Sequence, residues 1–106
     1  MSKSQNEEEY LDKVTDDRMV SLALAKNLRK TRAKARISGE KPVTFDWLSK
    51  VTTIHHVSIR RFEKGETGMT VANLVRLKEA LGCSWDDLLE GCTSNVVKAR
   101  RPRFRK

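Results

Sequence analysis

The chain has 106 residues, of which 38% are hydrophobic and 34% are charged, and its formal net charge is +8 with an isoelectric point near 9.9. This length accommodates one small domain with terminal segments and excludes a second hydrophobic core, while the positive balance favours a polyanionic partner. The sequence has neither the roughly 20-residue apolar run of a membrane span nor an N-terminal secretory signal, so we expect a cytoplasmic protein.

The charges divide the chain into three parts. Residues 1–19 carry three basic and six acidic side chains, residues 20–95 carry thirteen and eight, and residues 96–106 carry six and none. We therefore predict an acidic N-terminal segment over residues 1–18 that is disordered or marginally helical. A folded domain over residues 19–92 and a flexible basic tail over residues 93–106 are expected to follow. The acidic segment should lie outside any DNA contact.

The first strong helical pattern begins near Met19. Val20, Leu24 and Leu28 recur every four residues, as one apolar helix face requires, and they predict a helix over residues 19–35. The following SGEKP (residues 38–42) predicts a loop, because glycine and proline together end a helix. No β-hairpin pattern competes with a helical interpretation anywhere in the chain.

Two short helices joined by a tight turn are predicted next. Thr44 precedes an apolar pattern and is typical of an N-cap, so a helix should start after it and end near residue 51. Ile54, Ile59 and Phe62 form the next apolar set. They predict a helix over residues 56–64 that Gly65 ends.

Two more helices complete the expected domain. One covers residues 71–81, capped by Thr70 and ended by Gly82, and the other covers residues 85–90, capped by Ser84. The fold class is therefore all-α, with about five helices. Trp85 and Leu89 belong either to the core or to a dimer patch.

Several motifs agree in order and spacing over residues 24–91. The matching residues are Leu28, Arg29 and Arg32, then Leu48 and Ser49, then Ile59, Phe62, Glu63 and Gly65, and finally LVRLKEALGCSWDDLLEG (residues 74–91). Together they resemble the lambda-repressor-like (Xre/Cro) helix-turn-helix family of bacterial and phage DNA-binding proteins. Three residues depart from the family pattern. Thr53 replaces the turn glycine, which should bend the joint less tightly. His55 replaces the usual hydroxyl cap of the third helix, and Phe45 replaces a glutamine often found near a phosphate.

The resemblance implies a compact five-helix domain whose helix over residues 56–64 lies in the major groove of DNA. Such a helix reaches base edges with its first turn and one turn further on. The expected base-reading residues are His56, Val57 and Arg61, with Arg60 contacting phosphate or an outer base. The expected phosphate contacts are Thr44, Lys50, Thr53, His55, Lys64 and Thr67. The resemblance also implies a structural ion pair between Arg32 and Glu63.

The basic tail is expected to run along a groove or the DNA backbone. Arginines in an extended arm can enter the minor groove, and each neutralised phosphate makes binding more salt-dependent. The residues concerned are Lys98, Arg100, Arg101, Arg103, Arg105 and Lys106.

These features predict sequence-specific binding of double-stranded DNA by a transcriptional regulator of a bacterium, phage or mobile element. A homodimer on two half-sites is compatible with this. Two alternatives stay open. The first is an antitoxin or accessory interaction module that binds a protein partner through the acidic segment or the Trp85–Leu89 surface. The second is an accessory protein in plasmid or transposon DNA processing.

No enzymatic activity, cofactor or metal is expected. The sequence offers no glycine-rich phosphate loop, nucleophile constellation or paired acid and base. His55 and His56 are adjacent, and adjacent helix residues should point apart. Cys83 and Cys92 lack partner histidines at metal-ligand spacing, and Cys83 is interpreted as a buried inert thiol.

Overall fold

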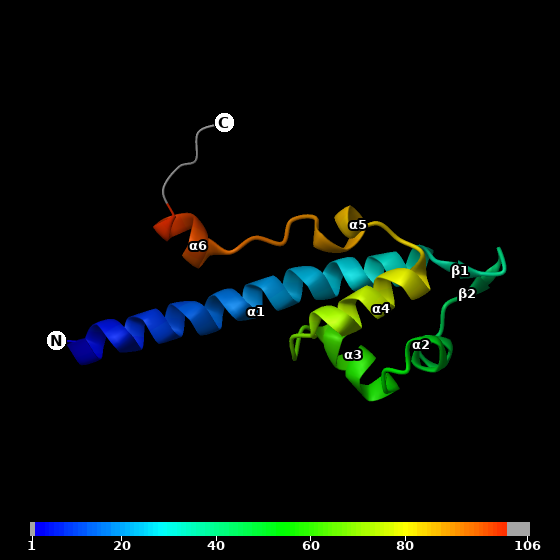
Figure 1. Cartoon of the computed structure of the whole chain (residues 1–106), viewed down its shortest axis with the longest axis horizontal. Helices are drawn as coiled ribbons and strands as arrows, with labels where there is room; N and C mark the ends of the chain where they lie inside the picture. Colours follow the sequence, from blue (N-terminus) through cyan, green and yellow to red (C-terminus); the bar gives the residue numbers. More distant parts are fainter. Residues whose placement is uncertain (1, 102–106) are drawn as a thin grey trace.

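The longest element of the fold is one helix, α1 (Ser2–Lys34), and the helices α3, α5 and α6 pack against it (Figure 1). The computed structural model describes residues 2–101, and of residues 2–13 the backbone alone. Within this range the protein is a mostly helical compact domain with six helices and one small hairpin. The remaining elements are β1 (Arg36–Ile37), β2 (Lys41–Pro42), α2 (Phe45–Thr52), α3 (His56–Lys64), α4 (Val71–Leu81), α5 (Trp85–Leu89) and α6 (Asn95–Arg100).

Local capping chemistry explains where α2 to α5 begin and end. The side chains of Thr44, Thr70 and Ser84 each accept a hydrogen bond from the backbone three residues on, at 3.1–3.2 Å, and so satisfy otherwise unpaired helix amides. Gly65 and Gly82 end α3 and α4 with φ of 70° and 64°. The predicted bounds of α3 and α4 are confirmed, and those of α2 and α5 differ by one residue.

The boundary predicted near residue 18 does not interrupt the helix in the structure. The acidic segment over residues 1–18 and the helix over residues 19–35 were expected as separate parts, yet α1 runs without interruption from Ser2 to Lys34. No glycine or proline lies within it. A helix of 33 residues spans about 50 Å.

The predicted loop over residues 38–42 is a turn at residues 38–40 followed by a strand, so a hairpin that the sequence did not predict forms here. Arg36 pairs with Pro42 and Ile37 with Lys41 in an antiparallel hairpin. Ser38 and Gly39 reverse the chain with φ of 51° and 88°, the positive values that tight hairpin turns need. Two-residue strands are too short to show the alternation by which sequence patterns reveal β-structure.

Within the predicted flexible tail over residues 93–106, the part that the structure describes contains a short helix that the sequence did not predict. Asn95–Arg100 form α6, which Ser94 caps. Asp16 of α1 accepts hydrogen bonds from the Ser94 hydroxyl at 2.6 Å and from the Asn95 amide at 2.7 Å. The Ser94 hydrogen bond, and then the backbone amides, hold the pKa of Asp16 below its ordinary value. Asp16 therefore anchors α6 to α1.

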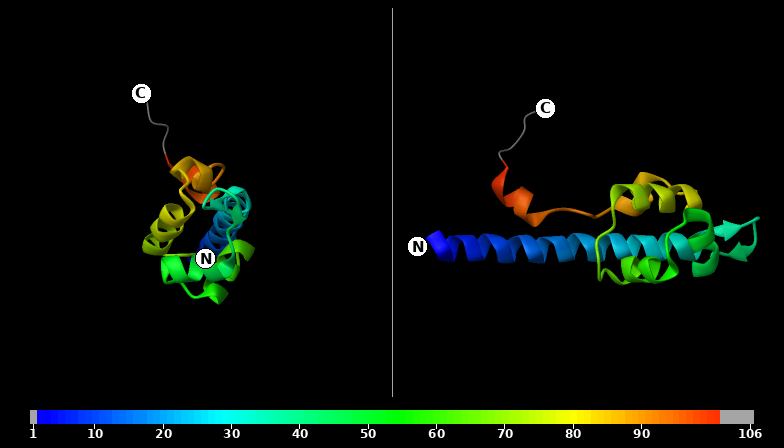
Figure 2. Two further views of the ribbon diagram at one scale, coloured as in Figure 1. Left: turned by 90° about the vertical axis from the view of Figure 1, so that its right-hand side faces the viewer. Right: turned by 60° about the horizontal axis from the view of Figure 1, so that its bottom comes forward.

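The hydrophobic core lies where α1 to α5 converge. Helix α1 packs against α3 and α5, and α2 packs against α3 and α4. The N-terminal half of α1 extends beyond this core with α6 beside it (Figure 2), and the molecule is 58 Å in its longest dimension. The buried apolar residues are Ala25, Leu28, Val43, Leu48, Ile54, Ile59, Phe62, Leu77, Leu81 and Leu88. None of the helices described is both long enough and apolar enough to cross a membrane.

Gly65 should be the glycine whose replacement costs most, because the end of α3 approaches α1 closely there. An added Cβ would lie 2.7 Å from Leu22 Cδ2 and 3.2 Å from Leu22 Cα, whereas a Cβ on Gly82 would meet nothing within 4 Å. We expect Gly65→Ala to lower the free energy of unfolding by about 2–4 kcal/mol, the sum of left-handed strain and overpacking. Gly82→Ala should cost only the strain, about 1–2 kcal/mol. Urea denaturation measures both, and equal losses would contradict the close packing.

Candidate nucleic-acid interface

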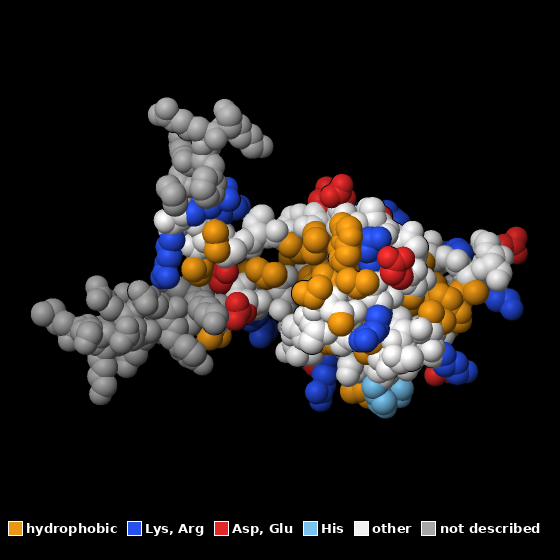
Figure 3. Space-filling model, viewed as in Figure 1, with side chains coloured by type: hydrophobic (Ala, Val, Ile, Leu, Met, Phe, Trp, Pro, Cys, Tyr) orange, Lys and Arg blue, Asp and Glu red, His pale blue; other side chains and the backbone are white. Residues whose placement is uncertain are grey.

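Helix α3 has one buried side and one exposed side. Ile59, Phe62 and Glu63 are 0%, 6% and 4% exposed and face the body of the domain. Residues three positions apart fall on the same helix face, and of the remaining positions only Ser58 is half-buried and the other five are exposed. The exposed residues are His56, Val57, Arg60, Arg61 and Lys64. In Figure 3 the two histidines, the only ones in the chain, gather at the lower edge of the molecule.

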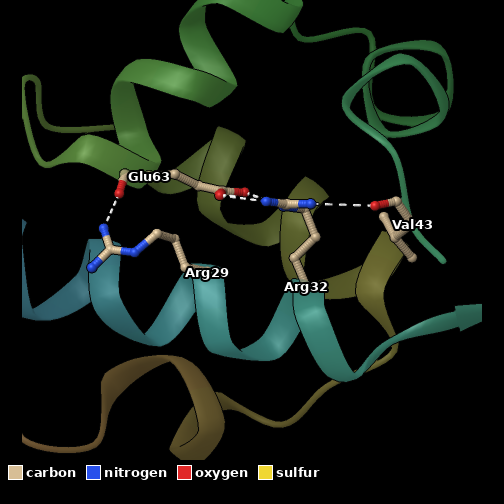
Figure 4. Close-up of polar contacts among 4 residues, drawn as sticks. All are labelled: Arg29, Arg32, Val43 and Glu63. Atoms are coloured by element: carbon tan, nitrogen blue, oxygen red, sulfur yellow. Dashed lines mark hydrogen bonds and ion pairs between the residues drawn. The ribbon is translucent and has the colours of Figure 1, made fainter.

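A two-pronged ion pair fixes the buried side of α3 to α1 (Figure 4). Arg32 Nε lies 2.5 Å from Glu63 Oε2, and Arg32 Nη2 lies 2.9 Å from Oε1. This is the pair that the family resemblance implied. Arg32 Nη1 also donates to the Val43 carbonyl at 3.4 Å, and Arg29 Nη1 donates to the Glu63 carbonyl. Glu63 thus joins α1 to α3 through both its side chain and its backbone.

The turn between α2 and α3 keeps a tight conformation without glycine. Thr53 has φ of 63° and ψ of 13°, in the left-handed region, and its amide donates to the Ser49 carbonyl at 2.9 Å. We expected threonine to bend this joint less tightly, but it adopts the conformation that glycine favours, at a strain of about 1–2 kcal/mol. Thr52 supports the turn, because its hydroxyl donates to the Leu48 carbonyl at 2.6 Å and accepts from the Ile54 amide at 3.2 Å.

His55 and His56 do not point apart, contrary to the prediction. Their rings stack with centroids 4.5 Å apart and an interplanar angle of 25°. The prediction assumed that both residues are helical, whereas His55 precedes α3 with an extended ψ of 138° and serves as its N-cap. His55 Nδ1 accepts from the Val57 amide at 3.2 Å. Among the described residues no group of three or more His, Cys, Asp or Glu is arranged to hold a metal.

Phe45 lies under two arginine side chains. The guanidinium carbon of Arg32 is 4.3 Å from the ring centroid and that of Arg60 is 5.0 Å away. Two hollows adjoin this stack, of about 320 Å³ and 500 Å³. The first is lined by Thr44, Phe45, Asp46, His56 and Arg60, and the second by Arg29, Phe45, Arg60, Glu63 and Lys64. No periodic pattern links residues 45 and 60, so these contacts with the Phe45 ring could not be predicted from the sequence.

The predicted phosphate contacts are only partly brought together. Thr44 lies at the first hollow and Lys64 at the second, while Lys50 and Thr67 line neither. Thr53 is exposed, and its hydroxyl already donates to the Thr52 carbonyl at 2.5 Å. The structure therefore places these residues around α2 and α3 without gathering them into one cluster.

The described part of the basic tail lies far from α3. Helix α6 and α3 are on opposite sides of α1 in all three ribbon views (Figures 1 and 2). Lys98 and Arg100 are exposed on α6, and the Arg101 amide donates to the Val97 carbonyl at 2.9 Å. The predicted contacts through Arg103, Arg105 and Lys106 fall outside the described residues. The fold does not bring α6 to the exposed side of α3.

The helices α4 and α5 expose apolar side chains. Trp85 and Leu89 are 41% and 42% exposed, so neither belongs to the core, and Lys78 Nζ lies 5.3 Å from the Trp85 ring centroid. Cys83 and Cys92 are half-buried, and burial raises the pKa of both thiols.

Comparison of the chain with protein family models, with curated proteins and with solved structures finds no match. The interpretation of α3 therefore rests on the contacts and charges of this chain.

The ion pair between Arg32 and Glu63 should be strongly coupled. We expect Glu63→Leu alone to lower the free energy of unfolding by about 3 kcal/mol, because the Arg32 charge is left partly buried without a partner. The double variant Arg32→Leu/Glu63→Leu should lose less than Glu63→Leu, since no unpaired charge remains. Urea denaturation of the wild type, both single variants and the double variant measures the coupling. Strictly additive losses would show that the two residues act independently.

Proposed function

We propose that this protein binds double-stranded DNA in a sequence-specific manner, with α3 in the major groove, and acts as a transcriptional regulator of the lambda-repressor-like (Xre/Cro) type. The two-sidedness of α3 is the observation that carries the proposal. Its buried side is fixed to α1 through Glu63, while four polar side chains and Val57 occupy its exposed side. A rigidly held helix with a polar outer face suits the width of the major groove.

The base-reading role falls to His56, Val57 and Arg61 in this proposal. All three are exposed on the first two turns of α3. An arginine can donate two parallel hydrogen bonds to guanine O6 and N7, and a valine methyl can touch the thymine methyl. The histidine ring can hydrogen-bond a purine edge.

Lys50 and Lys64 supply phosphate contacts beside the groove, which set the register of the protein on the duplex without reading its sequence. Both are exposed, at the ends of α2 and α3. The protein is a binding protein in this proposal, with no catalytic role, and it works in the cytoplasm as a regulator of a bacterium, phage or mobile element. A homodimer would read two half-sites about one helical turn apart.

Arg61→Ala and Lys50→Ala should affect DNA binding differently. Selection of bound sequences from random duplex DNA should recover a defined site for the wild type. For Arg61→Ala we expect one position of that site to become relaxed, at a cost of about 1–3 kcal/mol on the preferred base. Lys50→Ala should weaken all duplexes alike. Uniform loss of affinity in both variants would contradict the assignment of Arg61 to base reading.

Lys98 and Arg100 should contribute little to the same complex, because Asp16 holds α6 on the far side of α1. We expect the double variant Lys98→Ala/Arg100→Ala to leave the slope of log K against log salt nearly unchanged. The matched double variant Lys50→Ala/Lys64→Ala should reduce that slope by about 2. Fluorescence anisotropy titrations across a salt series measure both slopes. If both double variants reduced the slope equally, α6 would also contact the duplex that α3 binds.

A protein-interaction module is the second candidate, favoured by an exposed apolar surface on α4 and α5. Val71, Val75, Trp85 and Leu89 are 76%, 37%, 41% and 42% exposed, and apolar side chains spread over the face seen in Figure 3. Exposed apolar patches on small proteins often mark partner surfaces. This alternative predicts copurification with one protein and no preference among duplexes at physiological salt.

A further inference from the structure

Arg60 differs from its neighbours on α3 in how its side chain is held. Its guanidinium carbon lies 5.0 Å from the centroid of the Phe45 ring. Arg61, the next residue, is turned about 100° around the helix and has no ring contact among residues 14–101. Within the same range, no hydrogen bond or ion pair engages the Arg60 guanidinium. The cation–π contact with Phe45 is therefore the one polar or ring contact of the Arg60 guanidinium within residues 14–101.

Phe45 is itself firmly held, so it can act as a platform. It is the first residue of α2, is half-buried and packs against the hydrophobic core. The second arginine over its ring, Arg32, is committed to the Glu63 carboxylate and the Val43 carbonyl. The donors of Arg32 are therefore already used within the protein. Of the two arginines over the ring, Arg60 is the one whose N–H donors are available to a ligand.

Stacking restrains an arginine without consuming its hydrogen-bonding capacity. When a guanidinium lies face to face over an aromatic ring, its five N–H donors lie in the guanidinium plane and stay available for hydrogen bonds. A long side chain that is already ordered loses less conformational freedom on binding. Arg60 is thus preorganised for binding. It lines both hollows that Phe45 lines, and Phe45 places it near the start of α2.

We propose that Phe45 is a positioning residue that holds Arg60 for a contact with the sugar–phosphate backbone of DNA, so that Arg60 supplies affinity without reading a base. This inference rests on the proposed function, because it assigns a role within the same DNA complex. It separates the two adjacent arginines of α3. Arg61 reads a base edge, and Arg60 anchors the backbone beside it.

A double-mutant cycle on DNA binding by the full chain tests the proposal. Arg60→Ala is expected to weaken binding about fivefold on every duplex and to lower the salt slope by about 1. Phe45→Leu keeps the apolar packing but removes the ring, and should weaken binding about threefold. The double variant should bind no more weakly than Arg60→Ala, because the platform has no role once Arg60 is gone. Phe45→Tyr keeps an aromatic face and should restore wild-type binding.

Arg61→Ala provides the matched control. Its effect should add to that of Phe45→Leu, since Arg61 is not stacked on the ring. A structural role of Phe45 alone would instead lower the free energy of unfolding and weaken binding equally in both arginine backgrounds. Additivity of Phe45→Leu with Arg60→Ala would overturn the proposal, as would a changed base preference in Arg60→Ala.

The cycle also works on duplexes of random sequence, because a backbone contact needs no specific site. If the wild type selects no sequence, the proposed function fails, while the coupling between Phe45 and Arg60 is still decided on random duplex. If a site is selected but the coupling is absent, only the positioning role fails.

Discussion

The buried carboxylate of Glu63 is the constraint on which the arrangement of α3 depends. A carboxylate that is 4% exposed is stable only when its charge is neutralised and its oxygens are hydrogen-bonded. Arg32 meets both requirements with two nearly parallel contacts, and Arg29 binds the carbonyl of the same residue. Because such a fork tolerates little change in direction, the ion pair fixes both the position and the rotation of α3 relative to α1.

That rotation decides which side chains α3 offers to solvent. With Ile59, Phe62 and Glu63 turned inward, the two stacked histidines, Val57 and the adjacent arginines must face outward. The same arginine that holds Glu63 also lies over Phe45, and Phe45 restrains Arg60. Packing and the candidate interface are therefore linked through a short chain of contacts rather than lying in separate parts of the molecule.

The parts of the fold that sequence predicted well are those with local causes. The bounds of α3 and α4 follow from caps and apolar spacing within a few residues. Thr70, Gly65 and Gly82 placed three of them, and the apolar set of Ile54, Ile59 and Phe62 placed the start of α3. Helix α6 depends on Asp16, which lies 78 residues before Ser94, and no local pattern reveals such a partner. The contacts of the Phe45 ring and the stacking of His55 on His56 were not predicted either. Both depend on the direction of the backbone at a helix end, which no sequence pattern reveals. The ion pair was expected from resemblance alone.

The anchoring of α6 by Asp16 has a practical consequence for how the molecule can be attached to something else. The N-terminal half of α1 and the helix α6 both lie toward the same end of the molecule, beyond the core and away from α3 (Figures 1 and 2). A fluorescent protein, an affinity tag or a sensor surface joined at the start of α1 or at the end of α6 would thus be tethered at a distance from the exposed side of α3. Fusion at the hairpin between β1 and β2 would instead place the cargo at the opposite end of the domain.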